Sequence, residues 1–359
     1  MSVFYNENGY NMFDMLSMVQ KSIRRGLYEY AAFAANQLRI SYRTALWNRL
    51  MVISAEDCYG AITKEVVFLR CQDAENPDDQ NISNTLKLLC DCRKNRDACY
   101  FACNFVLYSF CPRGDKLKPT ADDIKNILDL ESPPQETLYD TKVDPYDRQK
   151  AILGANLKIA LDHRDMEMAG HEIDILRGEE RDFLWKVLMY AAPSEVLPEI
   201  NGLHIADGLV NKRKSADKRD EIFLSKAAMI ILHHADPAME SVESQQIRLD
   251  HLIDWTDMDV PSIREYIKGD IPDWVYDCHT LKGKKMGKTD WDMTITEQKA
   301  LTPLVKAYFD DASWMPTYTQ DFVDGVITVE QMEIIKSYAR CYDMQDNPVP
   351  HIPYEYERV

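Results

Sequence analysis

The segment KGKKMGKT (282–289) gathers the residues best suited to binding phosphate. Its cations are Lys282, Lys284, Lys285 and Lys288, and its flanking aromatic residues are Trp274, Tyr276 and Trp291. Basic side chains can follow a phosphate backbone while bases stack on aromatic rings, each stack being worth about 1–3 kcal/mol. The segment therefore predicts a contact with single-stranded nucleic acid, and a solvated basic turn is the alternative.

The end of this segment carries only part of a nucleotide-binding motif. Residues 287–289 match the end of the pattern G-x-x-x-x-G-K-[ST], but Gly283 lies four residues before Gly287, where the pattern needs five. No apolar strand leads into the segment, so the backbone cradle that holds a nucleotide is not expected.

Cysteine and histidine do not form a metal-binding pattern either. The nine cysteines are an odd number, which is typical of reduced thiols in a cytosolic protein. The group at 90, 92, 99 and 103 lacks paired C-x-x-C spacing and is predicted to consist of small buried residues. His279 follows Cys278, and we predict that it makes a hydrogen bond that fixes the turn. We expect no metal, no cofactor and no catalytic residue.

Two further basic segments are candidate contacts for nucleic acid. One, NKRKSADKRDE (211–221), contains Lys212, Arg213 and Lys214, and the other, KSIRRG (21–26), contains Arg24 and Arg25. The first segment occupies the place that the acidic loop CQDAENPDDQ (71–80) has earlier in the chain. Opposite charges at equivalent places could steer head-to-tail contacts between copies of the chain, and two solvated loops are the alternative.

Composition limits the classes of protein that the chain can belong to. Its 42 Lys and Arg against 59 Asp and Glu give a net charge of −17, which excludes indiscriminate coating of nucleic acid. The sequence has no apolar run long enough to span a membrane and no signal-peptide pattern at its start. We therefore expect a soluble cytoplasmic protein without membrane contact, whose polyanion contacts are confined to local basic sites.

Apolar residues recur with the helical period through long segments, which predicts an all-α fold. The predicted helices cover residues 27–38, 44–55, 82–94, 96–110, 151–176, 180–192, 221–234 and 328–342. Residues 113–150 are rich in Pro, Asp and Lys, and Pro133-Pro134 cannot lie inside a helix, so this stretch is predicted to be a linker or arm.

The two helical regions look related to each other. LWNRLMVISAED (46–57) aligns with LWKVLMYAAPSE (184–195), and NTLKLLCDC (84–92) falls near LSKAAMIIL (224–232). Leu and Trp at these spacings are core residues, so the repeat concerns packing. We predict an internal duplication with four parts: a helical unit 1–112, the linker 113–150, a second helical unit 151–270, and a partly irregular C-terminal region 271–359.

The first 110 residues resemble the C-terminal helical region of the RarA/MgsA replication-associated recombination ATPases. The resemblance is carried by Lys21, Ser22, Ile23, Arg24, Arg49, Leu50, Glu56 and Asp57, although the last run reads Ser-Ala-Glu-Asp rather than the family's Ala-Ser-Glu-Asp. It implies a helical oligomerisation module without its ATPase domain. Residues 277–301 look similar to a segment of stand-alone phage-encoded versions, which implies a phage origin and the host cytoplasm as location.

Within this motif the residue types favour ion pairs over chemistry. Glu56 and Asp57 adjoin a helix end, where their carboxylates could pair with Lys21, Arg24 or Arg49 brought near by folding. General acid–base catalysis by the two carboxylates is the alternative, but no histidine lies near them in the sequence.

These observations lead to three hypotheses of function. The first is a non-enzymatic, homo-oligomeric accessory protein of phage DNA replication, recombination or transcription that binds single-stranded DNA, a replication or transcription protein, or both. The second is a protein-interaction module or inhibitor of a host complex that does not touch nucleic acid. The third is an enzyme with an unrecognised site near His279.

Overall fold

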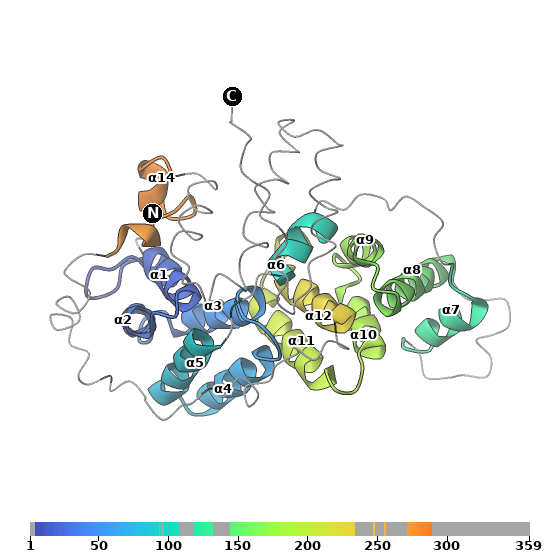
Figure 1. Ribbon diagram of the computed structural model, residues 1–359, viewed down its shortest axis with the longest axis horizontal. Helices are drawn as coiled ribbons and strands as arrows, with labels where there is room; N and C mark the ends of the chain where they lie inside the picture. Colours follow the sequence, from blue (N-terminus) through green and yellow to red (C-terminus); the bar gives the residue numbers. More distant parts are fainter. Residues whose placement is uncertain are drawn as a thin grey trace. The chain divides into compact units, whose positions relative to one another are not determined.

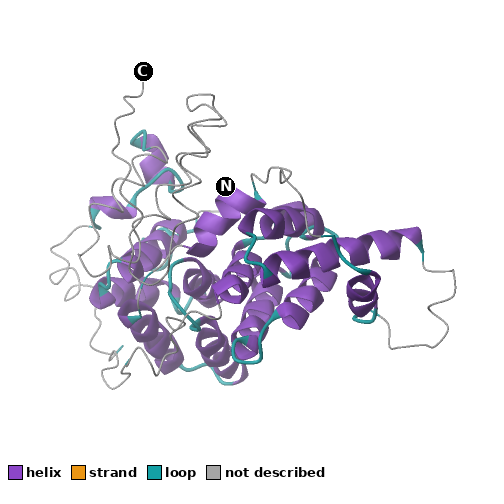
Figure 2. Ribbon diagram, turned by 45° about the vertical axis from the view of Figure 1, so that its right-hand side comes forward, coloured by secondary structure: helices purple, strands orange, loops and turns teal. Residues whose placement is uncertain are grey.

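The computed structural model describes residues 4–92, 94, 97–107, 118–131, 144–233, 247, 255 and 271–288. Apart from two isolated β-bridges, the regular structure in these residues is helical, which confirms the predicted all-α fold (Figure 2). None of the described helices is long and apolar enough to cross a lipid bilayer. The helix predicted at 328–342 lies outside the described residues.

The chain forms two compact units, whose limits differ from the predicted domain boundaries. Unit 1 contains residues 1–96 and 240–359, and unit 2 contains residues 97–239. Unit 1 therefore ends at 96 rather than 112, because the helical turns that follow pack within unit 2. The described residues 271–288 also belong to unit 1, so unit 2 is inserted between two parts of unit 1.

The N-terminal helices of unit 1 form a bundle and are joined by short connections (Figure 1). They are α1 (Met12–Arg24), α2 (Tyr28–Leu38), α3 (Arg43–Glu56), α4 (Thr63–Glu75) and α5 (Asp79–Asp91), followed after residue 240 by a 3₁₀ turn (Asp273–Val275) and α14 (Leu281–Lys285). The Asn11 side chain caps α1 and the Asp78 side chain caps α5, each by accepting a backbone N–H of the first turn. The apolar faces of these helices bury a core around Trp47 and Phe33.

Unit 2 contains a second set of helices. They are α6 (Asp97–Phe101), a π-helical turn (Ala102–Val106), α7 (Ala121–Leu128), α8 (Pro145–Asp162), α9 (Met166–Leu176), α10 (Arg181–Ala191), α11 (Leu197–Asn211), a 3₁₀ turn (Ala216–Lys218) and α12 (Ile222–His233). Helix α7 lies inside the stretch predicted as a linker, and a capping box of Thr120 and Asp123 starts it. A Cβ at Gly170 would lie 2.2 Å from the Phe105 carbonyl oxygen, so α9 packs directly on the backbone of the π-helical turn.

Helices α8–α12 follow the order of α1–α5, and the first three pairs have a constant spacing. Helix α1 ends at 24 and α8 at 162, α2 starts at 28 and α9 at 166, and α3 starts at 43 and α10 at 181, an offset of 138 residues each time. The turns after α1 and α8 share a left-handed residue, Gly26 with φ 65° and Arg164 with φ 57°. This turn divides the continuous helical stretch predicted at 151–176. The predicted pairing of 46–57 with 184–195 has the same offset.

A cluster of arginine, aspartate and tryptophan joins three helices of unit 1. The Arg43 guanidinium hydrogen-bonds both carboxylate oxygens of Asp73 and also reaches Asp79 at 2.6 Å. Trp47 Nε1 donates to the same Asp73 carboxylate at 2.7 Å. Arg39, one turn before Arg43, forms a second ion pair with Asp79. These contacts connect α3 to the end of α4 and the start of α5.

Unit 2 contains the same cluster at equivalent positions. The Arg181 guanidinium hydrogen-bonds Asp207 at 2.8 and 2.7 Å and Glu221 at 3.0 Å, and Trp185 Nε1 donates to Asp207 at 2.7 Å. Arg177, one turn earlier, pairs with Glu221 at 2.7 Å. Both units therefore place an arginine and a tryptophan four residues apart on one helix, where both bind a single aspartate of the next helix.

The clusters correct two details of the predicted repeat. Asp79 corresponds to Glu221, so the predicted pairing of 84 with 224 is two residues out of register. Asp73 is buried on α4 and not part of a solvated acidic loop. Burial disfavours its charged form, but the hydrogen bonds from Arg43, the Asp78 N–H and Trp47 outweigh this effect and hold the pKa of Asp73 below its usual value.

Replacing Asp207 with alanine should destabilise unit 2 strongly. The variant leaves the Arg181 guanidinium buried without its bidentate partner and removes the acceptor of Trp185 Nε1, which together cost about 3–5 kcal/mol. Urea unfolding followed by circular dichroism measures the loss. The control Glu179→Ala removes an exposed carboxylate of the α9–α10 turn and should change stability by less than about 0.5 kcal/mol. Equal midpoints for the two variants would contradict the assigned role of the cluster.

Candidate nucleic-acid interface

The basic residues of KSIRRG lie inside unit 1. Lys21 is 4% exposed, Arg24 is 5% exposed and Arg25 is 7% exposed. Ser22 and Ile23 between them are fully buried. A side chain that contacts a phosphate backbone has to be accessible to solvent. The prediction that Arg24 and Arg25 bind nucleic acid is therefore wrong, because folding uses both cations inside the unit.

The predicted ion pair at the end of α3 is present. Arg24 Nε donates to Asp57 at 2.8 Å, and its Nη2 donates to Glu56 at 3.3 Å. Gln20 Nε2 bonds both carboxylates at 2.9 Å, and its Oε1 accepts a hydrogen bond from Arg49 at 3.0 Å. Arg49 thus reaches this group through Gln20. The carboxylates hold α1 on α3, which favours their structural interpretation over acid–base catalysis.

Lys21 holds the C-terminal segment of unit 1 on α1. Its Nζ forms an ion pair with Asp277 at 2.7 Å and donates to the carbonyl oxygens of Trp274 at 2.9 Å and Val275 at 3.2 Å. The Ser17 hydroxyl donates to the same Val275 carbonyl at 2.6 Å. Lys21 therefore anchors residues from the far end of the sequence, while Arg24 provides the predicted ion pair with Glu56 and Asp57.

The aromatic residues of this segment are covered by cations of the same unit. The Arg25 guanidinium lies 4.4 Å from the ring centre of Trp274, and Lys282 Nζ lies 3.9 Å from that of Tyr276. Tyr276 is buried, and Tyr30 packs against Trp274. Cation–π contacts of this kind stabilise the segment. Trp274 is half-buried and Tyr276 is buried, so of these two rings only that of Trp274 is in part accessible, and Trp291 lies outside the described residues.

The turn before α14 is fixed by Asp277 and Thr280. The Asp277 carboxylate accepts the backbone N–H groups of His279 at 2.8 Å and Thr280 at 3.2 Å, and the Thr280 hydroxyl accepts that of Gly283 at 3.1 Å. A Cβ at Gly283 would lie 1.9 Å from the Asp277 carbonyl oxygen, so this close approach requires glycine. His279 takes part in the predicted turn hydrogen bond through its backbone N–H, while the residue itself is exposed.

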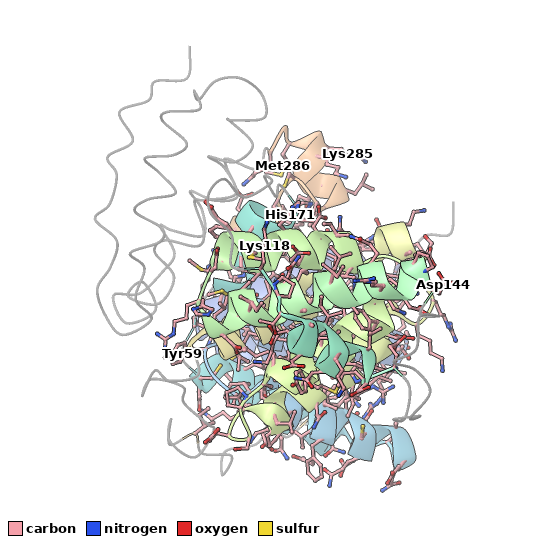
Figure 3. The ribbon with its side chains drawn as sticks, turned by 90° about the vertical axis from the view of Figure 1, so that its right-hand side faces the viewer. Tyr59, Lys118, Asp144, His171, Lys285 and Met286 are labelled. Carbon is pink, nitrogen blue, oxygen red and sulfur yellow. The ribbon has the colours of Figure 1, made fainter. Side chains whose placement is uncertain are left out.

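Three lysines of the predicted site are exposed on this fixed turn. Lys282, Lys284 and Lys285 belong to α14, and Figure 3 shows the side chains of Lys285 and Met286 pointing outward from it. Lys288 forms an ion pair with Asp273 at 3.0 Å. Lys284 and Lys285 have no ion pair with a carboxylate in the described part of the chain. The predicted flexible turn is thus a short capped helix that presents cations to solvent.

The basic loop between α11 and α12 is also accessible. Three of its cations are exposed, namely Lys212, Arg213 and Lys218. The other two, Lys214 and Arg219, are half-buried. None of the five forms an ion pair with a carboxylate of the described residues. No phenylalanine, tyrosine or tryptophan occurs between 197 and 219, so this loop has no aromatic platform for a base.

Two cysteines of the predicted group, Cys90 and Cys92, are buried, whereas Cys99 is half-buried and the side chain of Cys103 lies outside the described part of the structure. Cys58 is also buried, and burial raises the pKa of the Cys90 thiol to about 12. Lys94 is buried beside them and donates to the carbonyl oxygens of Cys90 and Cys92, where its charge complements the C-terminal end of α5. In the part of the chain that the structure describes, no group of three or more His, Cys, Asp or Glu is arranged to hold a metal ion.

Two carboxylates near the lysine turn have opposite pKa shifts. At Asp277, burial raises the pKa, but the hydrogen bond and charge of Lys21 outweigh it, and the pKa lies below its usual value. At Asp14 burial dominates and the pKa lies above its usual value, although the charge of Lys282 opposes this. Asp277 and Ser17 were not predicted as functional residues, although the spacing Asp-x-x-Thr at 277–280 is a turn signal.

No protein-family model matches this sequence, and no curated protein or solved structure is similar to it. The geometry of unit 1 and unit 2 is therefore the basis for the functional assignment.

Removing Lys21 should release the lysine turn from α1. In Lys21→Met, Asp277 stays buried without its partner. The free energy of opening the segment 273–288 should therefore fall by about 3 kcal/mol, and its backbone amides should exchange correspondingly faster. Hydrogen exchange read by mass spectrometry measures this effect. The double variant Lys21→Met/Asp277→Leu removes both charges and should recover much of the protection. An unchanged exchange rate in Lys21→Met would show that the ion pair does not hold the turn.

Acid should release the same turn. Because the folded pKa of Asp277 lies below its unfolded value of about 3.9, its stabilisation is complete above that pH and is lost as the pH falls through the folded pKa. Protection of the 273–288 amides should therefore fall below about pH 4 in the wild type. Asp277→Asn should lack this pH dependence of protection. The difference between the pH profiles of the wild type and Asp277→Asn therefore distinguishes the titration of Asp277 from that of Asp14. Parallel profiles would contradict the assignment.

Proposed function

We propose that this protein is a non-enzymatic accessory protein of DNA metabolism that binds the backbone of single-stranded DNA through the lysines of α14. The observation that carries the proposal is the fixed display of Lys282, Lys284 and Lys285 on one exposed turn. Lysine side chains on such a turn bind phosphate and release the counterions that surround the nucleic acid. The resemblance of the KSIRRG region to the RarA/MgsA helical region supports DNA replication or recombination as the setting.

The geometry favours contacts to phosphate over contacts to bases. The neighbouring rings of Trp274 and Tyr276 are engaged by Arg25 and Lys282, so base stacking contributes little at these residues. Binding by lysines alone is insensitive to sequence and weakens steeply with salt. The protein's net charge of −17 restricts such binding to this local site.

The resemblance also supports oligomerisation, a phage origin and a location in the host cytoplasm as parts of the proposal. A helical module that is present twice in one chain offers two sets of surfaces for association. A monomeric mass by light scattering would remove the homo-oligomer from the proposal.

Single-stranded DNA should bind with a salt dependence that reports on Lys284 and Lys285. The probe is a labelled oligothymidylate of about 20 nucleotides, longer than one binding site. Its affinity, measured by fluorescence anisotropy between about 50 and 200 mM salt, should fall linearly on a double-logarithmic plot. Lys284→Ala/Lys285→Ala removes two contacts, so the slope should become shallower by about 1.4, since each phosphate contact on a single strand contributes about 0.7.

The matched control is Lys118→Ala/Lys125→Ala, which changes the net charge equally at two exposed positions of unit 2. It should leave the slope unchanged. Absence of binding at about 50 mM salt, or equal slopes for the two double variants, would contradict the proposal.

A protein-interaction module is the second candidate function, and a feature of unit 2 favours it. Ile205 and Leu209 are exposed apolar residues one turn apart on α11, next to the basic loop. An enzyme centred on His279 finds less support, because the nearby Lys288 is paired with Asp273. ATP turnover above background would favour the enzyme.

A further inference from the structure

Helix α11 presents an apolar face to solvent, which unit 2 does not cover. Ile205 is 48% exposed and Leu209 is 41% exposed, and the spacing of four residues places them on the same side of the helix. Aliphatic side chains that are exposed next to each other contribute nothing to the core of unit 2. They are available for burial against another molecule.

At Gly208 this face of α11 has no side chain, which leaves open space on its surface. Gly208 lies beside Leu209 on the exposed side of α11, and a Cβ at this position would meet no atom within 4 Å. The glycine has a negative φ, so the helix does not need it for its backbone conformation. Glycine in a helix is destabilising relative to alanine, and here the missing side chain leaves room for close approach from outside.

The charge next to the apolar pair is mainly positive, because residues 212–220 carry five cations against the carboxylates of Asp217 and Asp220. Lys212 and Arg213 follow Leu209 on the same exposed side, and three further cations lie in the loop that continues to α12. The two carboxylates of α11, Glu199 and Asp207, are both buried. The apolar face therefore ends at cations without a carboxylate of α11 to balance them, in a protein whose total charge is strongly negative.

We propose that this face of α11, together with the basic loop, binds an acidic amphipathic helix of a partner protein. The apolar stripe of such a helix would bury Ile205 and Leu209, pack closely over Gly208, and place its carboxylates against Lys212 and Arg213. Nucleic acid fits this surface less well, because no phenylalanine, tyrosine or tryptophan between 197 and 219 can stack on a base. The surface goes beyond the DNA contact of α14 and lies in the other unit.

The test uses a synthetic helical peptide of about 20 residues as probe, with leucines four residues apart on one side and glutamates elsewhere. Anisotropy of the labelled peptide is measured with the full chain. Gly208→Trp fills the open space on the face and should weaken binding at least about tenfold. Leu209→Gln removes half of the apolar pair at an exposed helical position and should also weaken binding.

The matched control is Gly178→Trp, which adds the same side chain in the α9–α10 turn, where a Cβ likewise meets no atom within 4 Å. It should bind the peptide as the wild type does. Circular dichroism and thermal unfolding establish that the variants are folded, and Leu209→Gln keeps the test informative if Gly208→Trp is not. Lys284→Ala/Lys285→Ala should bind the peptide normally, which separates this surface from the DNA contact.

Four results would overturn the proposal. The first is that the peptide does not bind the wild type. The second is that Gly208→Trp binds the peptide as tightly as the wild type does, or that a scrambled peptide of the same composition binds the wild type equally well. The third is that oligothymidylate displaces the peptide and needs Lys212 and Arg213 to do so, and the fourth is that Gly208→Trp loses self-association in the absence of peptide. The third result would assign the loop to a polyanion, and the fourth would show that a second copy of the chain covers the face.

Discussion

Each unit is organised around one arginine, half-buried Arg43 or buried Arg181, whose guanidinium binds two carboxylates from separate segments of the chain. Moving a charged side chain into a protein interior costs several kcal/mol unless its hydrogen bonds are satisfied. Arg43 and Arg181 meet this requirement only when the next two helices place Asp73 and Asp79, or Asp207 and Glu221, within reach. The tryptophan one turn later binds the same aspartate, so apolar packing and ion pairing select the same arrangement. This shared constraint explains why α3–α5 and α10–α12 form the same cluster although few of their residues are identical and their connections differ in length.

Sequence periodicity predicted the all-α fold because amphipathic stripes are local, and most of the predicted helices lie within a few residues of the structure. Helices α1, α4, α7 and α11 were not predicted. The reason for α7 is that it lies in a stretch whose prolines and charges are typical of a linker. The repeat could have been extended upstream, since the spacing Arg-x-x-x-Arg-x-x-Leu-Trp occurs at 39–47 and again at 177–185. The unit limits could not be predicted, because they depend on contacts between residues far apart in the sequence.

For the candidate site, the sequence showed which residues are basic but not which of them would remain accessible. Arg24, Arg25 and Lys285 carry the same charge, yet the two arginines are buried and bonded inside unit 1, whereas Lys285 is exposed to solvent. The partner of Lys21 is Asp277, and no local pattern connects these positions. KSIRRG is thus an anchor for the segment that carries the exposed lysines. The apolar face of α11 was equally invisible, because Ile205 and Leu209 look like ordinary core residues when α11 itself is not predicted.

The insertion of unit 2 into unit 1 sets the order in which the molecule is completed on the ribosome. Lys21 Nζ bonds the Trp274 carbonyl across 253 positions of the chain. At synthesis rates of about 5–20 residues per second, the five N-terminal helices wait about 10–50 s for this partner. Throughout that interval Lys21 lacks its Asp277 partner, and the inserted unit has time to fold alone. Closure of unit 1 is therefore a late step, and a nascent chain that stalls within the insertion would lack the lysine turn altogether.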